Sequence, residues 1–154
     1  MKVLFVCLGN ICRSPMAAAI FNHKVQQRGL PYQGDSCGTG DYHIGAPADH
    51  RTLTVARKNG VQVNHAARQL SNDDLEEFDY IFAMDKSNQF NIQRLPAAQE
   101  NKHKIRLMRE YDPKGLGEVP DPYHGTLTDF QDVFEMLDRS IDRFINELQS
   151  KSNS

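Results

Sequence analysis

A short, continuous apolar run near the start of the chain constrains the fold more than any other feature of the sequence. Residues 2–6 combine β-branched and aromatic side chains without the polar alternation of a half-exposed strand. Such a run is typical of a strand buried in a parallel sheet. A loop over residues 7–13 follows, and Ser14-Pro15 has the residue types of a helix start, with Ser14 as the N-cap. The chain therefore begins as strand, loop and helix.

The same order of strand and helix recurs along the chain. Apolar runs alternate with segments whose apolar residues recur every three or four positions, and Gly, Asn and Pro residues separate them. This order predicts an α/β fold of three layers, in which helices flank both faces of an open parallel sheet. The predicted strands cover residues 2–6, 32–37, 80–84 and 104–108, and the predicted helices cover residues 14–28, 48–58, 71–74, 87–95 and 126–149.

The length and the charge of the chain limit its organisation and its partners. The chain has 154 residues, from which we expect one domain over residues 1–150 and a polar tail over 151–154, frayed from Ser150 on. The formal net charge is −2, so we expect no nucleic acid and no membrane among its partners.

The N-terminus and the cysteines predict where the protein works. The opening apolar run is too short for the core of a signal peptide, and no other run has the length of a membrane span. We therefore expect a cytoplasmic protein. The three cysteines have no spacing that suggests a disulfide framework, and they fit free thiols in a reducing compartment.

The strongest chemical signal is the loop between the first strand and the first helix, which reads CLGNICRS over residues 7–14. Backbone N–H groups in such a loop and at the following helix start can surround an anion. Arg13 adds a planar fork that suits two phosphate oxygens. The same donors favour the thiolate form of Cys7 at neutral pH, and Ser14 can donate a hydrogen bond to its sulfur. The loop therefore predicts phosphate binding and attack by Cys7 on phosphorus to give a phosphocysteine.

A leaving phenolate needs a proton, and carboxyl groups of the long loop over residues 110–125 are the candidates for the acid. We favour Asp121 as general acid and then as general base for water, because Pro122 keeps it out of a helix and Tyr123 adds an aromatic face. Glu118 and Asp112 are its rivals. Backbone amides and Arg13 neutralise the phosphate oxygens in this scheme, so we expect neither a metal nor a cofactor.

The loop and the Asp121-Pro122-Tyr123 segment together resemble the low-molecular-weight protein tyrosine phosphatases. The resemblance covers nearly the whole chain, and its further motifs are Asp35-Ser36, Gly38-Thr39, Ile44-Gly45, His65-Ala66-Ala67-Arg68, Asp79-Tyr80 and Met84-Asp85. It implies a sheet of about four parallel strands between helices. It also implies Cys7 as nucleophile, Arg13 as phosphate clamp and Asp121 as acid, in an enzyme that acts on phosphotyrosine-containing proteins and binds inorganic phosphate as product and inhibitor.

The resemblance also implies the walls of the site. It predicts that Asn10 holds the loop in a strained backbone geometry, within a supporting network that includes Ser36 and His65. An apolar and aromatic rim would admit a phenyl ring and leave phosphoserine too short to reach the loop. The expected substrate-binding residues are Leu8, Gly9, Asn10, Ile11, Cys12, Ser14, Tyr42 and Tyr123.

Several residues near these motifs have open or secondary roles. In the family that the chain resembles, the thiol equivalent to Cys12 can form a disulfide with the nucleophile and protect it; simple packing is the alternative. We expect Cys37 to be buried and inert, and Asp85 to cap the following helix. At the positions of His43 and His124, members of the family that the chain resembles often have other side chains. These histidines can change the charge of the rim near pH ~6.5.

Three other functions compete with the tyrosine phosphatase reading. A phosphoarginine phosphatase shares the motifs but tends to have threonine where this chain has Ile11. A thiol-dependent arsenate reductase needs a downstream cysteine pair, and this chain has no cysteine after Cys37. A binding or redox-sensing module would use Cys7 and Cys12 without turnover, but it would not need an acid at Asp121.

Overall fold

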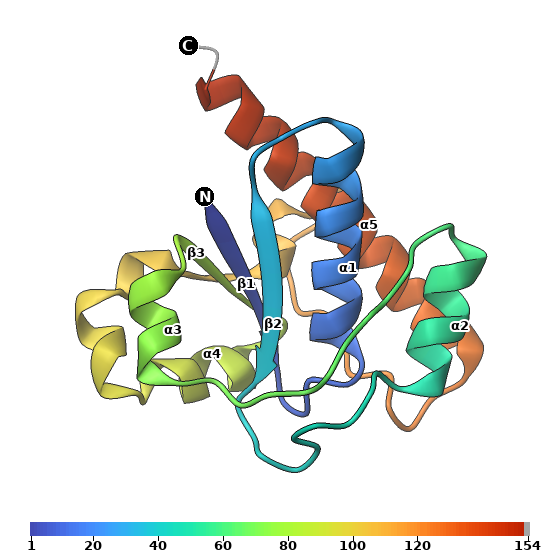
Figure 1. Ribbon diagram of the computed structural model, residues 1–154, viewed down its shortest axis with the longest axis horizontal. Coiled ribbons are helices and arrows are strands. Elements are labelled where there is room, and N and C mark those ends of the chain that lie inside the picture. Colours follow the sequence, from blue (N-terminus) through green and yellow to red (C-terminus); the bar gives the residue numbers. More distant parts are fainter. Residues whose placement is uncertain (153–154) are drawn as a thin grey trace.

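A parallel sheet forms the centre of the molecule, as Figure 1 shows for the computed structural model, which describes residues 1–152. Within these residues the sheet has four strands in the order β2-β1-β3-β4, and every neighbouring pair is parallel. The predicted α/β fold and parallel sheet are therefore confirmed. The strands are β1 (Lys2–Cys7), β2 (Gln33–Gly38), β3 (Tyr80–Ala83) and β4 (Ile105–Leu107).

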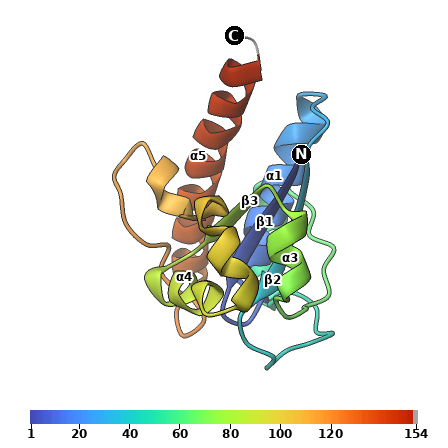
Figure 2. The same cartoon turned by 90° about the vertical axis from the view of Figure 1, so that its left-hand side faces the viewer.

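Helices cover both faces of this sheet and make three layers (Figure 2). On the first face α1 and α5 pack against the sheet and α2 packs against these two helices, and the second face packs against α3 and α4. The α-helices are α1 (Arg13–Gln27), α2 (His50–Lys58), α3 (Asn72–Glu77), α4 (Lys86–Gln93) and α5 (Leu127–Ser152), and the 3₁₀ turns are η1 (Pro96–Glu100), η2 (Lys102–Lys104) and η3 (Met108–Tyr111).

Strand β1 shows why both faces must be covered. Its side chains alternate between the two faces, so that Val3 and Phe5 join the core under α1 and α5, whereas Leu4 and Val6 join the core under α3 and α4. All four are fully buried. A strand with no polar face must be covered on both sides, and the continuous apolar run in the sequence reflects this requirement.

Aromatic rings connect the sheet to α5. The ring centroid of Phe82 on β3 lies 4.8 Å from that of Phe144 on α5, in an edge-to-face arrangement. Phe82 also stacks on Phe5 of β1 at 5.9 Å. These rings are fully buried, so the long helix is fixed against the centre of the sheet.

The predicted N-cap of the first helix is wrong. Helix α1 starts at Arg13 with Cys12 in the N-cap position, so Ser14 lies inside the helix and is not its cap. Its hydroxyl instead contacts Cys7 and Asn10. For this contact, the helix must begin before Ser14, and it begins at Arg13. A polar tail was expected from Ser150 on; α5 extends to Ser152, and residues 153–154 lie outside the described residues.

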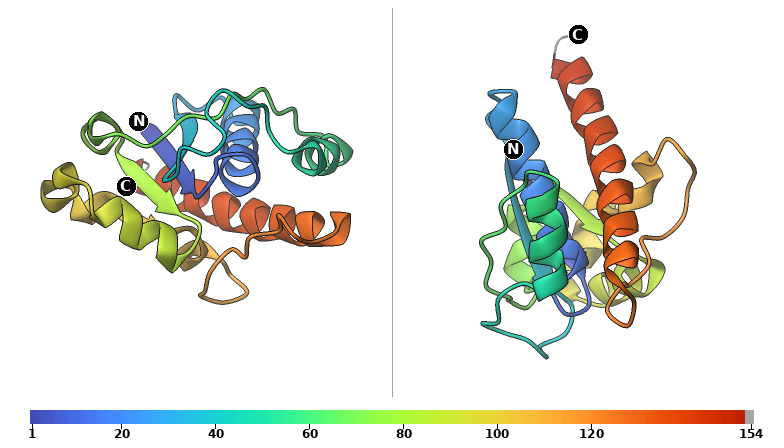
Figure 3. Two further views of the ribbon diagram at one scale, coloured as in Figure 1. Left: turned by 90° about the horizontal axis from the view of Figure 1, so that it is seen from below. Right: turned by 90° about the vertical axis from the view of Figure 1, so that its right-hand side faces the viewer.

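The carboxyl ends of the strands gather the functional loops at one edge of the sheet. The loop after β1 lies at this edge in Figures 1 and 3, and the later part of the long connection over residues 112–126 reaches it. Val119 of that connection donates its N–H to the carbonyl of Met84, just past β3, at 2.8 Å. Ligands of open α/β sheets bind at such an edge. None of the helices described is both long enough and apolar enough to cross a membrane.

Candidate active site

The loop over residues 8–12 turns sharply between β1 and α1, and Asn10 makes the turn. Its φ angle is 56°, and it is the only residue other than glycine with a positive φ among residues 1–152. Asparagine tolerates this left-handed conformation better than most residues. The conformation was implied by the family resemblance, and the structure has it.

The buried side chain of Asn10 connects the loop to its surroundings. Its amide nitrogen donates to Ser14 Oγ at 2.7 Å and to Ser36 Oγ at 3.0 Å, and its Oδ1 accepts from the N–H of Arg68 at 3.0 Å. His65 Nε2 lies 2.6 Å from the Asn10 carbonyl oxygen. Because a carbonyl only accepts, His65 must carry a proton on Nε2. Burial lowers the pKa of His65, although this hydrogen bond opposes the shift.

This network orients the hydroxyl of Ser14 toward the sulfur of Cys7. Cys7 Sγ lies 2.9 Å from Ser14 Oγ. Because Asn10 already donates to Ser14, the Ser14 hydrogen is free for another acceptor, and the carbonyl of Cys37 lies farther away at 3.4 Å. A hydroxyl that donates to sulfur stabilises a thiolate more than a thiol.

Arg13 is buried and held from two sides. Its Nη1 donates to Asp85 Oδ2 at 2.7 Å and to the carbonyl oxygen of Val119 at 3.0 Å, while its Nη2 lies 3.8 Å from Asp121 Oδ2. Asp85 also accepts from Asn88 N at 2.7 Å and so caps α4, as the sequence predicted. Its contact with Arg13 was not predicted, although its place after β3 put it at the same sheet edge as Cys7.

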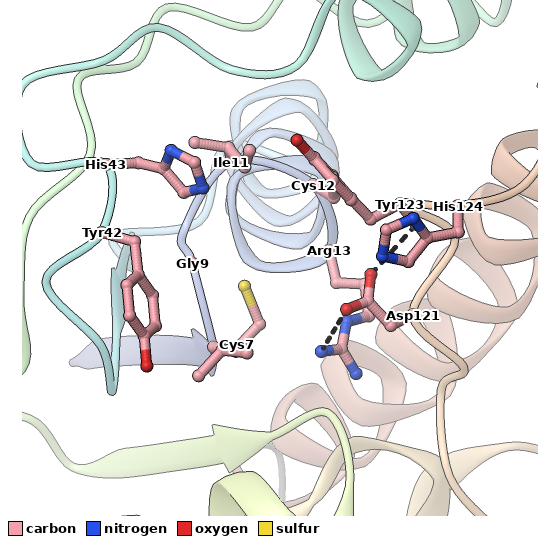
Figure 4. A pocket seen from close by; sticks show the side chains of 11 residues that line it. Cys7, Gly9, Ile11, Cys12, Arg13, Tyr42, His43, Asp121, Tyr123 and His124 are labelled. Carbon is pink, nitrogen blue, oxygen red and sulfur yellow. Dashed lines mark hydrogen bonds and ion pairs between the residues drawn. The ribbon is translucent and has the colours of Figure 1, made fainter.

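These groups surround one pocket, of about 230 Å³ (Figure 4). In this view the sulfur of Cys7 lies between Tyr42 on one side and the paired Arg13 and Asp121 on the other. Leu8, Tyr42 and Tyr123 are exposed large side chains at its rim. The lining residues are Cys7, Leu8, Gly9, Ile11, Cys12, Arg13, Tyr42, His43, Asp121, Tyr123 and His124.

The three candidate acids lie in different places. Only Asp121 lines the pocket. Glu118 accepts a hydrogen bond from the N–H of Lys86. The side chain of Asp112 is fully buried and paired with Arg139 and Arg109. Burial by itself would raise the pKa of Asp112, but hydrogen bonds from these arginines and from the Lys114 N–H outweigh it and lower the pKa to about 2. Asp112 therefore stays ionised and has no proton to donate.

The other cysteines and the two rim histidines differ in their surroundings. Cys12 lines the pocket, and burial together with nearby Asp49 raises its pKa to about 12. Cys37 is fully buried and all three cysteines are free thiols. His43 and His124 both line the pocket, and the His124 ring meets the Tyr123 ring edge to face. No group of three or more His, Cys, Asp or Glu side chains within residues 1–152 is arranged to hold a metal ion.

Comparison with known proteins agrees with this geometry. The sequence model of the family described as low molecular weight phosphotyrosine protein phosphatase matches residues 2–154. A phosphatase of this description from Schizosaccharomyces pombe is 49% identical over 88% of this chain and 89% of its own. The chain belongs to this family. It is therefore a hydrolase, a low-molecular-weight protein tyrosine phosphatase.

Solved structures share the fold of this phosphatase. A protein tyrosine phosphatase from Entamoeba histolytica with Hepes in the active site is 40% identical, covers 99% of both chains and superposes with a TM-score of 0.93. The YwlE arginine phosphatase from Geobacillus stearothermophilus is 28% identical over 97% of this chain and 94% of its own, with a TM-score of 0.86. The same backbone therefore occurs in a tyrosine phosphatase and in an arginine phosphatase, and side chains must separate the two activities.

Proposed function

We propose that this phosphatase hydrolyses protein phosphotyrosine and aryl phosphates through a phosphocysteine on Cys7. The observation that carries the proposal is that Cys7, Arg13 and Asp121 line one pocket while Ser14 contacts the Cys7 sulfur. In the first step the Cys7 thiolate attacks phosphorus, an S–P bond forms, and the bond from phosphorus to the phenolic oxygen breaks. Asp121 gives its proton to that oxygen.

The second step returns the enzyme to its starting state. Asp121, now a carboxylate, takes a proton from water as the water oxygen attacks phosphorus, and the S–P bond breaks. Cys7 leaves as a thiolate that the Ser14 hydroxyl stabilises. Inorganic phosphate is the product, and it inhibits by occupying the same loop.

Two features of the loop suit the charge that this reaction carries. No side chain caps the first turn of α1 within the described residues, so its N–H groups can donate to phosphate oxygens. Arg13 keeps its fork beside the pocket because Asp85 and the Val119 carbonyl hold its other side. Donors fixed in advance stabilise a transition state without reorganisation.

The rim supports an aryl substrate. Leu8, Tyr42 and Tyr123 offer apolar and aromatic surface above the loop, which suits a phenyl ring. Ile11 in the lining has no polar group to bind a guanidinium. We therefore favour phosphotyrosine over phosphoarginine, and hydrolysis of matched peptides with either residue distinguishes the two.

The nucleophile is tested by Cys7→Ser, with Cys37→Ala as control. We expect Cys7→Ser to abolish hydrolysis of a phosphotyrosine peptide, because a serine hydroxyl in this loop is a far weaker nucleophile than a thiolate. Acid-quenched wild-type protein should carry one phosphate on Cys7 by mass spectrometry, and the Cys37→Ala protein should do the same. Undiminished turnover by Cys7→Ser excludes the covalent route.

The acid is tested by Asp121→Asn, with Glu118→Gln as control. We expect Asp121→Asn to lower kcat/KM for phenyl phosphate by roughly 10²–10⁴-fold, a typical contribution of a general acid. Glu118→Gln should leave kcat/KM near the wild-type value. The reverse pattern would transfer the role to Glu118.

A further inference from the structure

The first turn of α2 joins the two loops that face the substrate. Asp49, the N-cap of α2, donates its backbone N–H to the carbonyl oxygen of Ile11 in the cysteine loop at 2.7 Å. Two residues later, in the same turn, Arg51 donates to the carbonyl oxygen of Tyr123 at 2.8 Å and to that of Gly125 at 3.0 Å. A single turn of helix therefore contacts the nucleophile loop and the loop of Asp121.

The guanidinium of Arg51 is fixed by more than these two carbonyls. Asp49 accepts from Arg51 Nε and Nη2, both at 3.0 Å. The guanidinium carbon also lies 4.4 Å from the ring centroid of Phe130 on α5 and 5.6 Å from that of Tyr123. The charge is thus paired, and the planar fork has one orientation. Helix α2 lies beside the first turns of α5 in Figures 1 and 3, which places these contacts in one layer.

Asp121 itself has few contacts of its own. Its side chain is 48% exposed, and its Oδ1 accepts from the N–H of Tyr123 at 3.1 Å. On its N-terminal side the chain is anchored at Val119, by Met84 and Arg13. On its C-terminal side the anchor is the pair of carbonyls that Arg51 binds. The position of the Asp121 carboxyl group therefore depends on both anchors, and Figure 4 shows it beside Arg13 at the pocket.

We propose that Arg51 is a positioning residue of the reaction, which holds the Tyr123–Gly125 segment so that Asp121 faces the phenolic oxygen above Cys7. This role rests on the proposed function of Asp121 as the acid. Arg51 acts through Asp121 and does not contact the phosphate itself. A displacement of an acid by ~1 Å can lower the rate ~10²-fold. Loss of the contacts from Arg51 should therefore slow the step in which Asp121 donates its proton.

The dependence of the rate on the leaving group separates positioning from a general structural effect. Phenyl phosphate needs a proton on its leaving oxygen, whereas dinitrophenyl phosphate releases a stable anion. We expect Arg51→Met to lower kcat/KM for phenyl phosphate by roughly 10–100-fold and to leave kcat/KM for dinitrophenyl phosphate within about 3-fold of wild type. Combined with Asp121→Asn, Arg51→Met should add almost no further loss, because the two changes remove the same proton transfer.

Two further variants complete the experiment. Arg57→Met, on the exposed side of the same helix, should leave both rates and the melting temperature close to wild type. Arg51→Lys keeps the charge and can bind one carbonyl, so it should show the same leaving-group pattern with a smaller loss, even if Arg51→Met folds poorly.

The outcomes distinguish the failure of this role from the failure of the proposed function. Suppose that Asp121→Asn lowers kcat/KM for phenyl phosphate selectively. The positioning role is then overturned if the Arg51 variants lower kcat/KM equally for both substrates, or for neither. If Asp121→Asn also shows no dependence on the leaving group, the acid itself is misassigned, and the role of Arg51 falls with it.

Discussion

Asn10 has two roles in the site, one through its backbone and one through its side chain. Its left-handed backbone turns the loop, and its side chain satisfies Ser14, Ser36 and the Arg68 N–H at once. The residue is 1% exposed, so water cannot replace a lost partner. A buried group without a partner costs about 1–3 kcal/mol.

Substituting Asn10 separates these two roles. We expect Asn10→Ala and Asn10→Gly to lower kcat for a phenyl phosphate alike, since both release the Ser14 hydroxyl. Glycine tolerates the positive φ, so Asn10→Gly should be the more stable variant by about 1–2 kcal/mol in urea unfolding. Full activity of Asn10→Gly would mean that the backbone turn alone matters and that the side-chain network does not serve catalysis.

Helix α5 does more than complete the core, because it also fixes the connection that precedes it. Arg139 on α5 donates to both carboxyl oxygens of Asp112, at 2.7 Å and 3.1 Å, and Arg109 of η3 donates to Asp112 at 2.9 Å. Asp112 thus ties the start of the connection over residues 112–126 to the long helix. Its pKa of about 2 lies below the ordinary value of 3.8.

This pairing predicts a specific dependence of stability on pH. The unfolded chain binds a proton at Asp112 near pH ~4, whereas the folded chain binds it only near pH ~2, so the contribution of Asp112 is complete above pH ~4 and disappears as the pH falls through ~2. Its size is about 2 kcal/mol, at 1.4 kcal/mol per pKa unit. Urea unfolding of wild type and Asp112→Asn should therefore differ by about this amount near pH ~6 and converge near pH ~2. A constant difference would contradict this account.

At the scale of the whole molecule, parallel strand ends bring distant residues together. The register pairs Val6 of β1 with Cys37 of β2 and with Ala83 of β3, so Cys7, and Asp85 just past β3, leave the sheet at the same edge. Arg13 and Asp85, which are 72 residues apart in the sequence, therefore meet. The connection that carries Asp121 reaches the same edge because Val119 is bound to the end of β3.

Local patterns in the sequence were sufficient to predict the strand, loop and helix around Cys7. Burial on both faces of β1 requires an apolar run, and the cysteine, arginine and serine spacing between a buried strand and a helix start predicts an anion loop. The α/β class followed from the alternation of such segments. The start of helix α1 could not be predicted from Ser14. A serine hydroxyl at this position can either cap the helix or contact Cys7, and the conformation of the loop determines which contact forms.

The contacts that complete the pocket were decided by tertiary structure alone. The Asp121-Pro122-Tyr123 segment favoured Asp121 over Glu118 from the sequence. Nothing local binds Glu118 at the start of α4 or assigns Arg51 to carbonyl groups 72 and 74 residues away. Such contacts depend on where whole elements lie after the sheet and helices have packed. The sequence by itself determined the fold class and the reactive loop, because period and spacing are local properties. Only the folded molecule decided that Asp121 lines the pocket and which contacts hold its loop there.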